Sequence, residues 1–475
     1  GEGASAKAMR VAALETRQAK DRDITDESLR EGWRMRAEEI GLTREKIAGR
    51  LGHERPGASV LTVRQVERSV TAHVSHFDRR DAIRAVAENL PHGAPAHEVE
   101  RLADEFLASD SVRRIAETPR GPRFTTERIW ELERRALAVA EQMHGAGGVA
   151  VVDPILVRRV LVTYPSLKAD QRVMVERLLG DGRALEVVVG EAGTGKTYAT
   201  AAAAAAWSDS GYEVEAAAPT WRAATVLRGE GIPARTVASL IARLDQAEEA
   251  GREALRPGSV LLVDEAGMVD SQTLARLIDH ARRSEAKLVL LGDPAQLGEI
   301  EAGGLFAAIA RRSEEICLDE VIRHRHDLDR EGAKLIREGE GSQALDRYAH
   351  EGRVVVAADH ELRREAIVSD WREARRRGED ALMIARLNSE RERLNERARE
   401  AMRAEGRLGD SEVEIGGHPF AAGDEVITRV NDRRAQVFNR ERWRVEAVDA
   451  QAQAMVLVGI DTDGRRLRVD ADYLG

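Results

Sequence analysis

The sequence predicts an α/β protein whose central parallel sheet is preceded by a helical region and followed by a small antiparallel barrel. Three observations predict this fold class. Between about residues 161 and 320, short apolar runs alternate with helical stretches, which is typical of buried parallel strands joined by crossover helices. Charged helical patterns dominate before this region, and strand-like segments separated by turn residues follow residue 412.

Length and composition limit the classes of protein that the chain can represent. Its 475 residues are enough for several domains, each with its own core. We find no apolar run of about 18 residues, so we expect no membrane insertion. The single cysteine, Cys317, cannot form an internal disulfide, which fits a reducing cytoplasm. The chain has 73 basic and 83 acidic residues and a net charge of -10, so its overall charge gives no sign of nucleic-acid binding. Any nucleic-acid site must therefore be a local one.

The region before the sheet has two parts. Residues 1–64 have apolar positions at helical spacing among mixed charges and are predicted to form a solvated helical tail or linker. Residues 65–160 are predicted to form a winged-helix-like module, in which Asp78 can cap the first helix. Its other expected elements are a helix with Val99, Leu102 and Phe106, an extended piece at 122–124 and a long helix from about Glu127 to Met143.

The first strand of the predicted sheet leads into a phosphate-binding loop. The apolar runs that predict the strands are 187–189, 214–218, 260–263 and 288–291. The segment GEAGTGKT matches GxxxxGK[ST] between the first run and an alanine-rich helix, which is the context that this motif requires. Such a loop surrounds phosphate with backbone N–H groups, while its lysine neutralises phosphate charge and its last hydroxyl binds magnesium. The loop residues are Gly190, Glu191, Ala192, Gly193, Thr194, Gly195, Lys196 and Thr197.

Polar residues that follow two later runs complete a predicted ATP and magnesium site. Asp264 directly follows the third run and can hold magnesium through a water molecule. Glu265 can polarise the water that attacks the phosphate. A buried ion pair or a solvated helix start is the structural alternative for this pair. Gln296, in GDPAQ after the fourth run, can report the nucleotide state by exchanging hydrogen bonds; otherwise it is an ordinary loop residue.

The order of these motifs is similar to that of a known enzyme family. GEAGTGKT, APTWRAATVL, RTVASL, LLVDEAGMVD and LVLLGDPAQL resemble successive motifs of superfamily 1 DNA helicases of the RecD-like branch. The resemblance implies two RecA-like domains with ATP in the cleft between them, single-stranded DNA across their top, and 5′-to-3′ translocation. ATP and magnesium are then the expected cofactors and single-stranded DNA the expected partner.

The resemblance also assigns roles to residues near the nucleotide. Gln171 corresponds to a glutamine that recognises adenine, with an exposed helix residue as the alternative. Arg323, in LDEVIRHR, resembles the arginine that reaches the γ-phosphate from the second motor domain. Arg325 is two residues away and stays a second candidate, and a surface role is the alternative for both.

Further residues match family segments that contact DNA. Pro219, Thr220, Thr236 and Ser239 match segments that touch the DNA backbone, where neutral hydroxyl and N–H groups suffice. Helix capping is the competing explanation for the hydroxyls. Asn388, together with the nearby Arg386, resembles a later helicase segment that contacts DNA.

The flanking regions narrow the resemblance to conjugative relaxase-helicases of plasmid transfer. The first 160 residues are similar to the stretch between their relaxase and helicase domains, and FAAGDEVITRVNDRRAQVFNRERWRV is similar to the SH3-like insertion of their second motor domain. A nicking site is absent, because Tyr164 is the first tyrosine and no histidine cluster accompanies it. The expected domains are a helical tail or linker (1–64), a winged-helix-like module (65–160), a first RecA-like motor domain (161–320), a partial second one (321–411) and an SH3-like barrel insertion (412–475).

Three hypotheses about function follow. The leading one is the ATP-dependent, single-strand-translocating helicase segment of a conjugative relaxase, working with other conjugation or relaxosome proteins. The second is a RecD-like repair helicase, and the third is a non-hydrolysing DNA-binding module with a helicase fold. Because the second motor domain is expected to be incomplete, we expect the chain to bind nucleotide and to hydrolyse it slowly.

Overall fold

The computed structural model describes residues 61–72, 74–90, 93–118, 121–191, 193–296, 304–318, 326–415, 418–429, 432, 435, 437–460 and 464–470. The helical tail predicted for residues 1–64 therefore lies almost wholly outside the described residues. Residues 59–355 form one compact unit, and the chain from Val356 onwards belongs to a second. None of the described helices is both long and apolar enough to cross a membrane.

The first unit begins with a small module of helices and a hairpin. Phe77 is fully buried at its centre, and its ring lies 6.0 Å from that of Phe106 and 6.2 Å from that of Phe124. Asp78 caps the helix that directly follows it, as predicted, because its side chain accepts hydrogen bonds from the N–H groups of Arg80 and Asp81. The elements are α4 (Val63–Val70), α5 (Arg79–Glu88), α6 (Ala96–Leu107), β1 (Val112–Thr118), β2 (Gly121–Thr126) and α7 (Glu127–Gly145).

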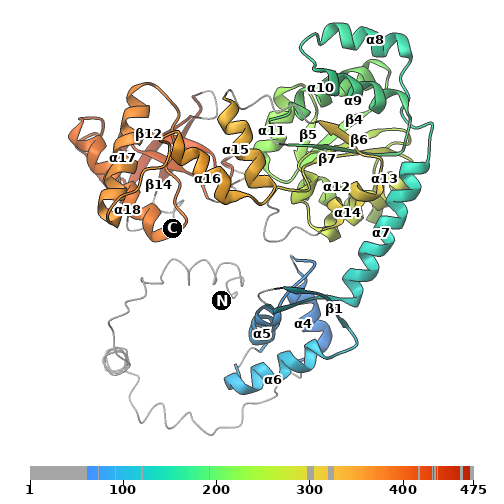
Figure 1. Cartoon of the computed structure of the whole chain (residues 1–475), viewed down its shortest axis with the longest axis horizontal. Helices are drawn as coiled ribbons and strands as arrows, with labels where there is room; N and C mark the ends of the chain where they lie inside the picture. Colours follow the sequence, from blue (N-terminus) through green and yellow to red (C-terminus); the bar gives the residue numbers. More distant parts are fainter. Residues whose placement is uncertain are drawn as a thin grey trace. The chain divides into compact units, whose positions relative to one another are not determined.

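A six-stranded parallel sheet forms the centre of this unit and confirms the α/β fold class (Figure 1). The strand order is β5-β4-β6-β7-β3-β8, so β7 lies between β6 and β3. This order brings the carboxyl ends of those three strands together at one edge. The strands are β3 (Leu185–Gly190), β4 (Val214–Ala218), β5 (Ala234–Thr236), β6 (Val260–Val263), β7 (Lys287–Gly292) and β8 (Ile316–Leu318).

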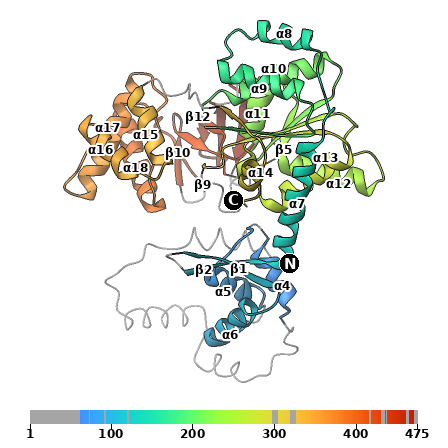
Figure 2. The ribbon, with the colours of Figure 1, turned by 45° about the vertical axis from the view of Figure 1, so that its right-hand side comes forward.

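Helices cover both faces of the sheet because alternate strand residues point to opposite sides. Val188 of β3 belongs to the core beneath α9 and α10, whereas the neighbouring Val187 belongs to the core shared with α7, α12 and α13. Figure 2 shows the same layers from another side. The helices are α8 (Pro154–Thr163), α9 (Ala169–Gly180), α10 (Lys196–Asp209), α11 (Trp221–Gly229), α12 (Val237–Glu249), η1 (Ala266–Met268), α13 (Ser271–Arg283), α14 (Leu305–Arg312), α15 (Asp327–Arg337) and α16 (Gly341–His350).

In its described part, the second unit contains two helices and a set of antiparallel strands, and the fully buried Trp443 belongs to the core of the strands. Four strands pair in the order β11-β12-β13-β14, which agrees with the antiparallel region expected after residue 412. Their identification as an SH3-like insertion stays a prediction. The elements are α17 (His360–Arg376), α18 (Asn388–Ala404), β9 (Glu412–Ile415), β10 (His418–Ala421), β11 (Glu425–Ile427), β12 (Arg442–Asp449), β13 (Ala454–Gly459) and β14 (Arg466–Asp470).

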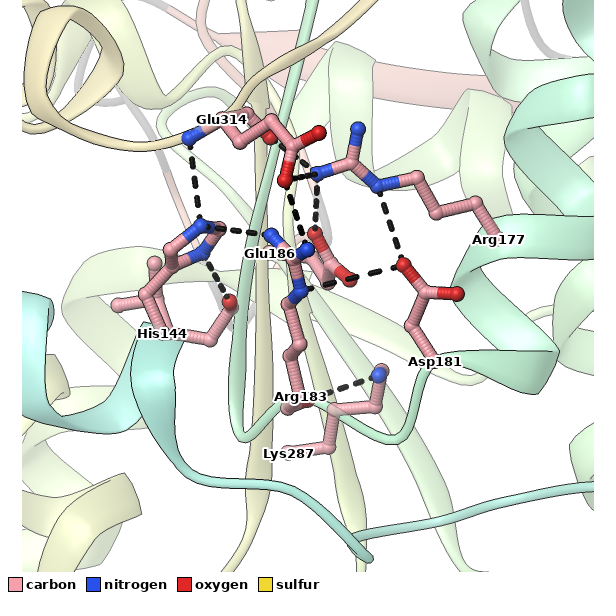
Figure 3. A network of polar contacts seen from close by, with 8 residues as sticks. His144, Arg177, Asp181, Arg183, Glu186, Lys287 and Glu314 are labelled. Carbon is pink, nitrogen blue, oxygen red and sulfur yellow. Dashed lines mark hydrogen bonds and ion pairs between the residues drawn. The ribbon is translucent and has the colours of Figure 1, made fainter.

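A network of charged side chains lies near the amino ends of β3 and β7, at the opposite end of β3 from the phosphate-binding loop (Figure 3). Lys287 is fully buried, and its Nζ donates a hydrogen bond to the carbonyl of Arg183 at 2.8 Å. Glu186 is also fully buried, and among the described residues neither carboxylate oxygen has a hydrogen-bond partner. Burial raises the pKa of Glu186 and lowers the pKa of Lys287 to about 8, while each charge partly offsets the effect on the other.

We expect these two buried charges to depend on each other for stability. Lys287→Met alone leaves the Glu186 carboxylate buried without this ammonium group, so it should lower the free energy of unfolding by about 3–5 kcal/mol. Adding Glu186→Leu removes the buried carboxylate, whose remaining ion pair is with Arg177 at 3.6 Å, and should restore most of that loss. Urea unfolding of the two single variants and the double variant tests this. Additive losses in the double variant would contradict the coupling.

Candidate nucleotide-binding site

The phosphate-binding loop connects β3 to α10 through backbone conformations that glycine favours. Gly193 and Gly195 have φ angles of 92° and 76°, in the left-handed region. Gly190 lies so close to its neighbours that a Cβ atom there would be 2.9 Å from the Thr194 hydroxyl. No side chain caps the N-terminus of α10. Its first N–H groups can therefore bind an anion.

Lys196 lies against the loop that it is predicted to serve. Only 7% of the residue is exposed, and its Nζ donates hydrogen bonds to the carbonyl of Gly190 and, at 3.0 Å, to the carbonyl of Glu191. The ammonium group therefore occupies the concave side of the loop, paired with the loop's own carbonyls. A bound phosphate would be a stronger partner for it, because it carries full negative charge.

Gln171 of α9 is held against the same loop. The residue is 1% exposed; its Nε2 donates to the carbonyl of Thr194 at 2.7 Å and its Oε1 accepts from the N–H of Lys168 at 3.0 Å. The alternative of an ordinary exposed residue is therefore wrong, because this side chain fixes a loop carbonyl. Adenine recognition by Gln171 stays a prediction.

Asp264 and Glu265 follow β6 at the carboxyl edge of the sheet. The N–H of Asp264 still bonds to the carbonyl of Ala217 in β4 at 2.9 Å, so the strand geometry positions the carboxylate. Burial raises the pKa of Asp264 to about 6 and Glu265 adds to this, whereas Lys196 opposes it. Glu265 has a φ of 51°, a left-handed conformation that costs a non-glycine residue of order 1 kcal/mol.

The segment after β7 lies between the loop and Asp264, because β7 separates β3 from β6. Asp293 is 4% exposed, and its Oδ1 accepts a hydrogen bond from the N–H of Ala295 at 2.9 Å. The N–H of Gln296 donates to the carbonyl of Asp293 at 3.3 Å. Gln296 is thus tied to the same edge as the loop, and its role as a nucleotide sensor stays a prediction.

One arginine at this edge was not singled out in the sequence. Nη1 of Arg337, the last residue of α15, lies 2.5 Å from Oδ2 of Asp293, and its Nε lies 3.4 Å from Oε1 of Glu191. Nothing in the local sequence distinguishes it from other helical arginines. Arg323, Arg325 and Ala192 lie outside the described residues.

The four predicted DNA contacts of the first motor domain lie where β4 and β5 end. The hydroxyl of Thr220 accepts a hydrogen bond from the N–H of Ala223 at 3.2 Å and caps α11. The hydroxyl of Thr236 accepts from the N–H of Ser239 at 3.2 Å and caps α12. Capping therefore accounts for both threonines, and contact with DNA stays a prediction for them, for Ser239 and for Pro219.

The remaining predicted contacts belong to the second unit. Asn388 is the first residue of α18 and is exposed. Arg386 precedes this helix and is also exposed. A DNA role for this segment stays a prediction.

The donor set suits magnesium bound together with a nucleotide. In the part of the chain that the structure describes, no group of three or more His, Cys, Asp or Glu side chains could hold a metal ion by itself. Magnesium in nucleotide sites takes only one or two protein ligands, because phosphate and water oxygens supply the others. The Thr197 hydroxyl, in the first turn of α10, and the Asp264 carboxylate meet that requirement.

Comparisons with known proteins show what this chain is similar to. Residues 166–359 match the AAA domain family. The conjugal transfer protein TraA of Agrobacterium fabrum is 32% identical over 355 residues, which cover 72% of this chain and 31% of that protein. A probable TraA of Sinorhizobium fredii is 29% identical over 85% of this chain and 37% of its own length. The chain therefore spans about a third of the length of these relatives.

The helicase resemblance is also found. The ATP-dependent RecD2 DNA helicase of Deinococcus radiodurans is 33% identical over 33% of this chain and 22% of that protein. A structure of Bacteroides Pif1 bound to ssDNA aligns with 64% of this chain and 74% of its own, at 15% identity and a TM-score of 0.41. The sequence comparisons confirm the similarity to conjugal transfer proteins and RecD-like helicases that the motifs indicate.

Proposed function

Because the chain carries a P-loop NTPase domain of the AAA type and is similar to conjugal transfer proteins, we propose that it is the ATP-dependent helicase segment of a conjugative relaxase. It would move 5′ to 3′ on single-stranded DNA in the cytoplasm, together with other conjugation or relaxosome proteins. One observation carries the proposal. The phosphate-binding loop, the Asp264–Glu265 pair and the Asp293 segment meet at the carboxyl ends of three adjacent strands.

Each residue has a distinct role in ATP hydrolysis under this proposal. Lys196 exchanges the loop carbonyls for the β- and γ-phosphates, and the N–H groups of the loop surround the β-phosphate. Thr197 and Asp264 hold magnesium, which when bound neutralises phosphate charge. Glu265 orients the attacking water, and Gln296 and Arg323 respond to the γ-phosphate.

The second unit supports a partial second motor domain. Short apolar stretches in its sequence resemble the strand-forming runs of the first sheet, yet Val356 is 90% exposed and Ile384 is 89% exposed. By contrast, every residue of β6 is buried. Exposed apolar segments of this kind mark surfaces that another part of a protein can cover. We therefore keep residues 321–411 as a partial RecA-like domain and residues 412–475 as its SH3-like insertion.

The share of this chain that each similarity covers favours a role in conjugation over a role in repair. The RecD2 similarity covers 33% of this chain, whereas the two TraA similarities cover 72% and 85% of it. The larger coverage must include residues outside the motor core. The non-hydrolysing alternative is tested by ATP hydrolysis itself, since the Lys196, Asp264 and Glu265 side chains are all present.

We expect an aromatic contact to DNA beside Thr220. Trp221 begins α11 and is half-buried, and the Arg228 guanidinium lies 3.8 Å from the centre of its ring. Stacking of one base on an aromatic ring contributes about 1–3 kcal/mol. Trp221→Ala should therefore weaken binding of a labelled single-stranded oligonucleotide by about 5- to 150-fold in an anisotropy titration.

The matched control is Trp130→Ala. Trp130 is 41% exposed and also has an arginine, Arg113, over its ring, at 4.9 Å, but it lies on α7. Its replacement should leave DNA affinity unchanged. Equal affinities of the two variants would exclude Trp221 from the DNA interface.

A further inference from the structure

The hairpin of helices α15 and α16 contacts the nucleotide edge of the sheet through one arginine. Arg337 ends α15, and its guanidinium lies against both Asp293, which follows β7, and Glu191 in the phosphate-binding loop. The loop and the segment that contains Gln296 are thus joined to the same side chain. This geometry suggests that the nucleotide state of the loop affects the hairpin.

The two helices of the hairpin pack closely against each other. A Cβ atom on Gly332 of α15 would lie 2.3 Å from the hydroxyl of Tyr348 in α16, so only glycine allows the two helices to pack this closely. Arg347 of α16 forms an ion pair with Glu331 of α15. A displacement of Arg337 would therefore shift both helices together.

The two anchors of Arg337 differ in burial. The Asp293 side chain is 2% exposed, and a buried carboxylate is costly without a cation, so this contact is the firm one. The Glu191 side chain is 35% exposed and its contact, at 3.4 Å, is longer. Exposed ion pairs of this kind are worth little and rearrange easily. The contact between Arg337 and Glu191 can therefore change when a ligand binds, while the contact between Arg337 and Asp293 stays in place.

Arg337 also retains donors for a third anion. A guanidinium group carries five N–H donors in a fixed plane, and the two contacts to described residues use only some of them. Phosphate groups in the loop would lie beside Glu191, and arginine binds phosphate well. A bound nucleotide would then give Arg337 an additional anionic partner and hold the hairpin more tightly.

We propose that Arg337 is a positioning residue that transmits nucleotide occupancy from the phosphate-binding loop to the α15–α16 hairpin. This inference rests on the proposed nucleotide-binding function. It assigns to Arg337 a role separate from that expected for Arg323. Coupling of this kind is reciprocal, so loss of Arg337 also weakens nucleotide binding.

Hydrogen exchange measured by mass spectrometry tests the proposal on the whole chain, with and without magnesium and a non-hydrolysable ATP analogue. In the wild type, we expect the analogue to slow exchange in residues 326–350. Arg337→Ala should speed exchange there about tenfold in the free protein, because charge-assisted contacts are lost. It should also abolish the slowing by the analogue, while the loop peptide still responds.

Two variants make the outcome specific. Lys334→Ala removes another basic side chain of the same helix, which is 73% exposed and forms an ion pair with Glu338 at 3.9 Å, and it should behave like the wild type. Arg337→Lys keeps the positive charge but lacks the planar set of N–H donors of the guanidinium group. It should therefore preserve the fold and lose most of the nucleotide response. Circular dichroism and thermal unfolding show whether each variant folds. If Arg337→Ala does not fold, hydrogen exchange of Arg337→Lys tests the proposal instead.

The results separate this proposal from the one on which it rests. A full nucleotide response of residues 326–350 in a folded Arg337 variant would overturn the role of Arg337. An analogue that fails to protect the loop peptide in the wild type would instead contradict nucleotide binding, and the Lys196→Ala variant provides the reference for that result.

Discussion

Replacing Lys196 with alanine is expected to weaken binding of magnesium-ADP and magnesium-ATP at least about 100-fold and to make ATP hydrolysis undetectable. The ammonium group already lies inside the loop, bonded to the carbonyls of Gly190 and Glu191. In the variant nothing offsets the charge of the β- and γ-phosphates at that position. Titration with a fluorescent ADP measures the affinity.

The matched control for that variant is Lys334→Ala. Lys334 is 73% exposed on α15, and among the described residues its ion pair is a 3.9 Å contact with Glu338, which follows that helix. Its replacement should leave nucleotide affinity unchanged. A Lys196→Ala protein that is folded and binds nucleotide as tightly as the wild type would show that GEAGTGKT is not the binding loop.

The second large effect is expected for Asp264→Asn, which should abolish hydrolysis and yet stabilise the fold. Without its carboxylate, the site loses the predicted magnesium ligand, and the rate should fall by at least about 100-fold. The asparagine oxygen can still accept the hydrogen bond that the N–H of Glu265 donates to Asp264 at 2.9 Å. The local backbone should therefore keep its geometry.

The sign of the stability change follows from the pKa of Asp264, which burial raises to about 6. The folded protein binds this proton more tightly than the unfolded chain, so the carboxyl costs nothing at pH values below about 4. The cost grows as the pH rises to about 6 and is constant above that. Because the residue keeps partial exposure, we expect Asp264→Asn to stabilise the protein by about 1–3 kcal/mol at pH 7.5.

Urea unfolding of the wild type and Asp264→Asn at pH 4.5, 6 and 7.5 measures this difference. The advantage of the variant should be largest at pH 7.5 and should shrink towards pH 4.5. A variant that is less stable than the wild type at pH 7.5 would contradict the view that the buried Asp264 carboxylate destabilises the fold. So would a stability difference in favour of the variant that grows as the pH falls.

Local sequence was sufficient to predict the parts of the fold that depend on short-range patterns. The run 260–263 predicts β6 at its observed bounds, because a buried parallel strand is apolar on both faces. Asp78 identifies the start of α5 through its side-chain chemistry. GEAGTGKT and the Asp264–Glu265 pair predict the site, because their chemistry requires those residues at consecutive positions.

Features that depend on long-range contacts were not predictable in this way. Arg337 reaches Asp293 from a helix 44 residues later, and no local pattern marks it. Glu186 and Lys287 look like charges in otherwise apolar strands, and only the sheet brings them near each other. The helical spacing of Ile83, Val86, Ala87 and Leu90 predicts one buried face in α5, yet Ala87 is exposed, and the module buries Ala82, Ala85 and Val86. Which face of an isolated helix is buried depends on its neighbours.

The most direct test of the central claim is the steady-state rate of ATP hydrolysis as a function of single-stranded DNA concentration. For an ATP-driven motor on single strands, the rate should rise and saturate with an unstructured oligonucleotide, even where the absolute rate of this chain is low. Blunt duplex DNA should not reproduce the rise, and Lys196→Ala should lack it. A hydrolysis rate that is independent of single-stranded DNA, in a protein that binds both ligands, would contradict the proposed function.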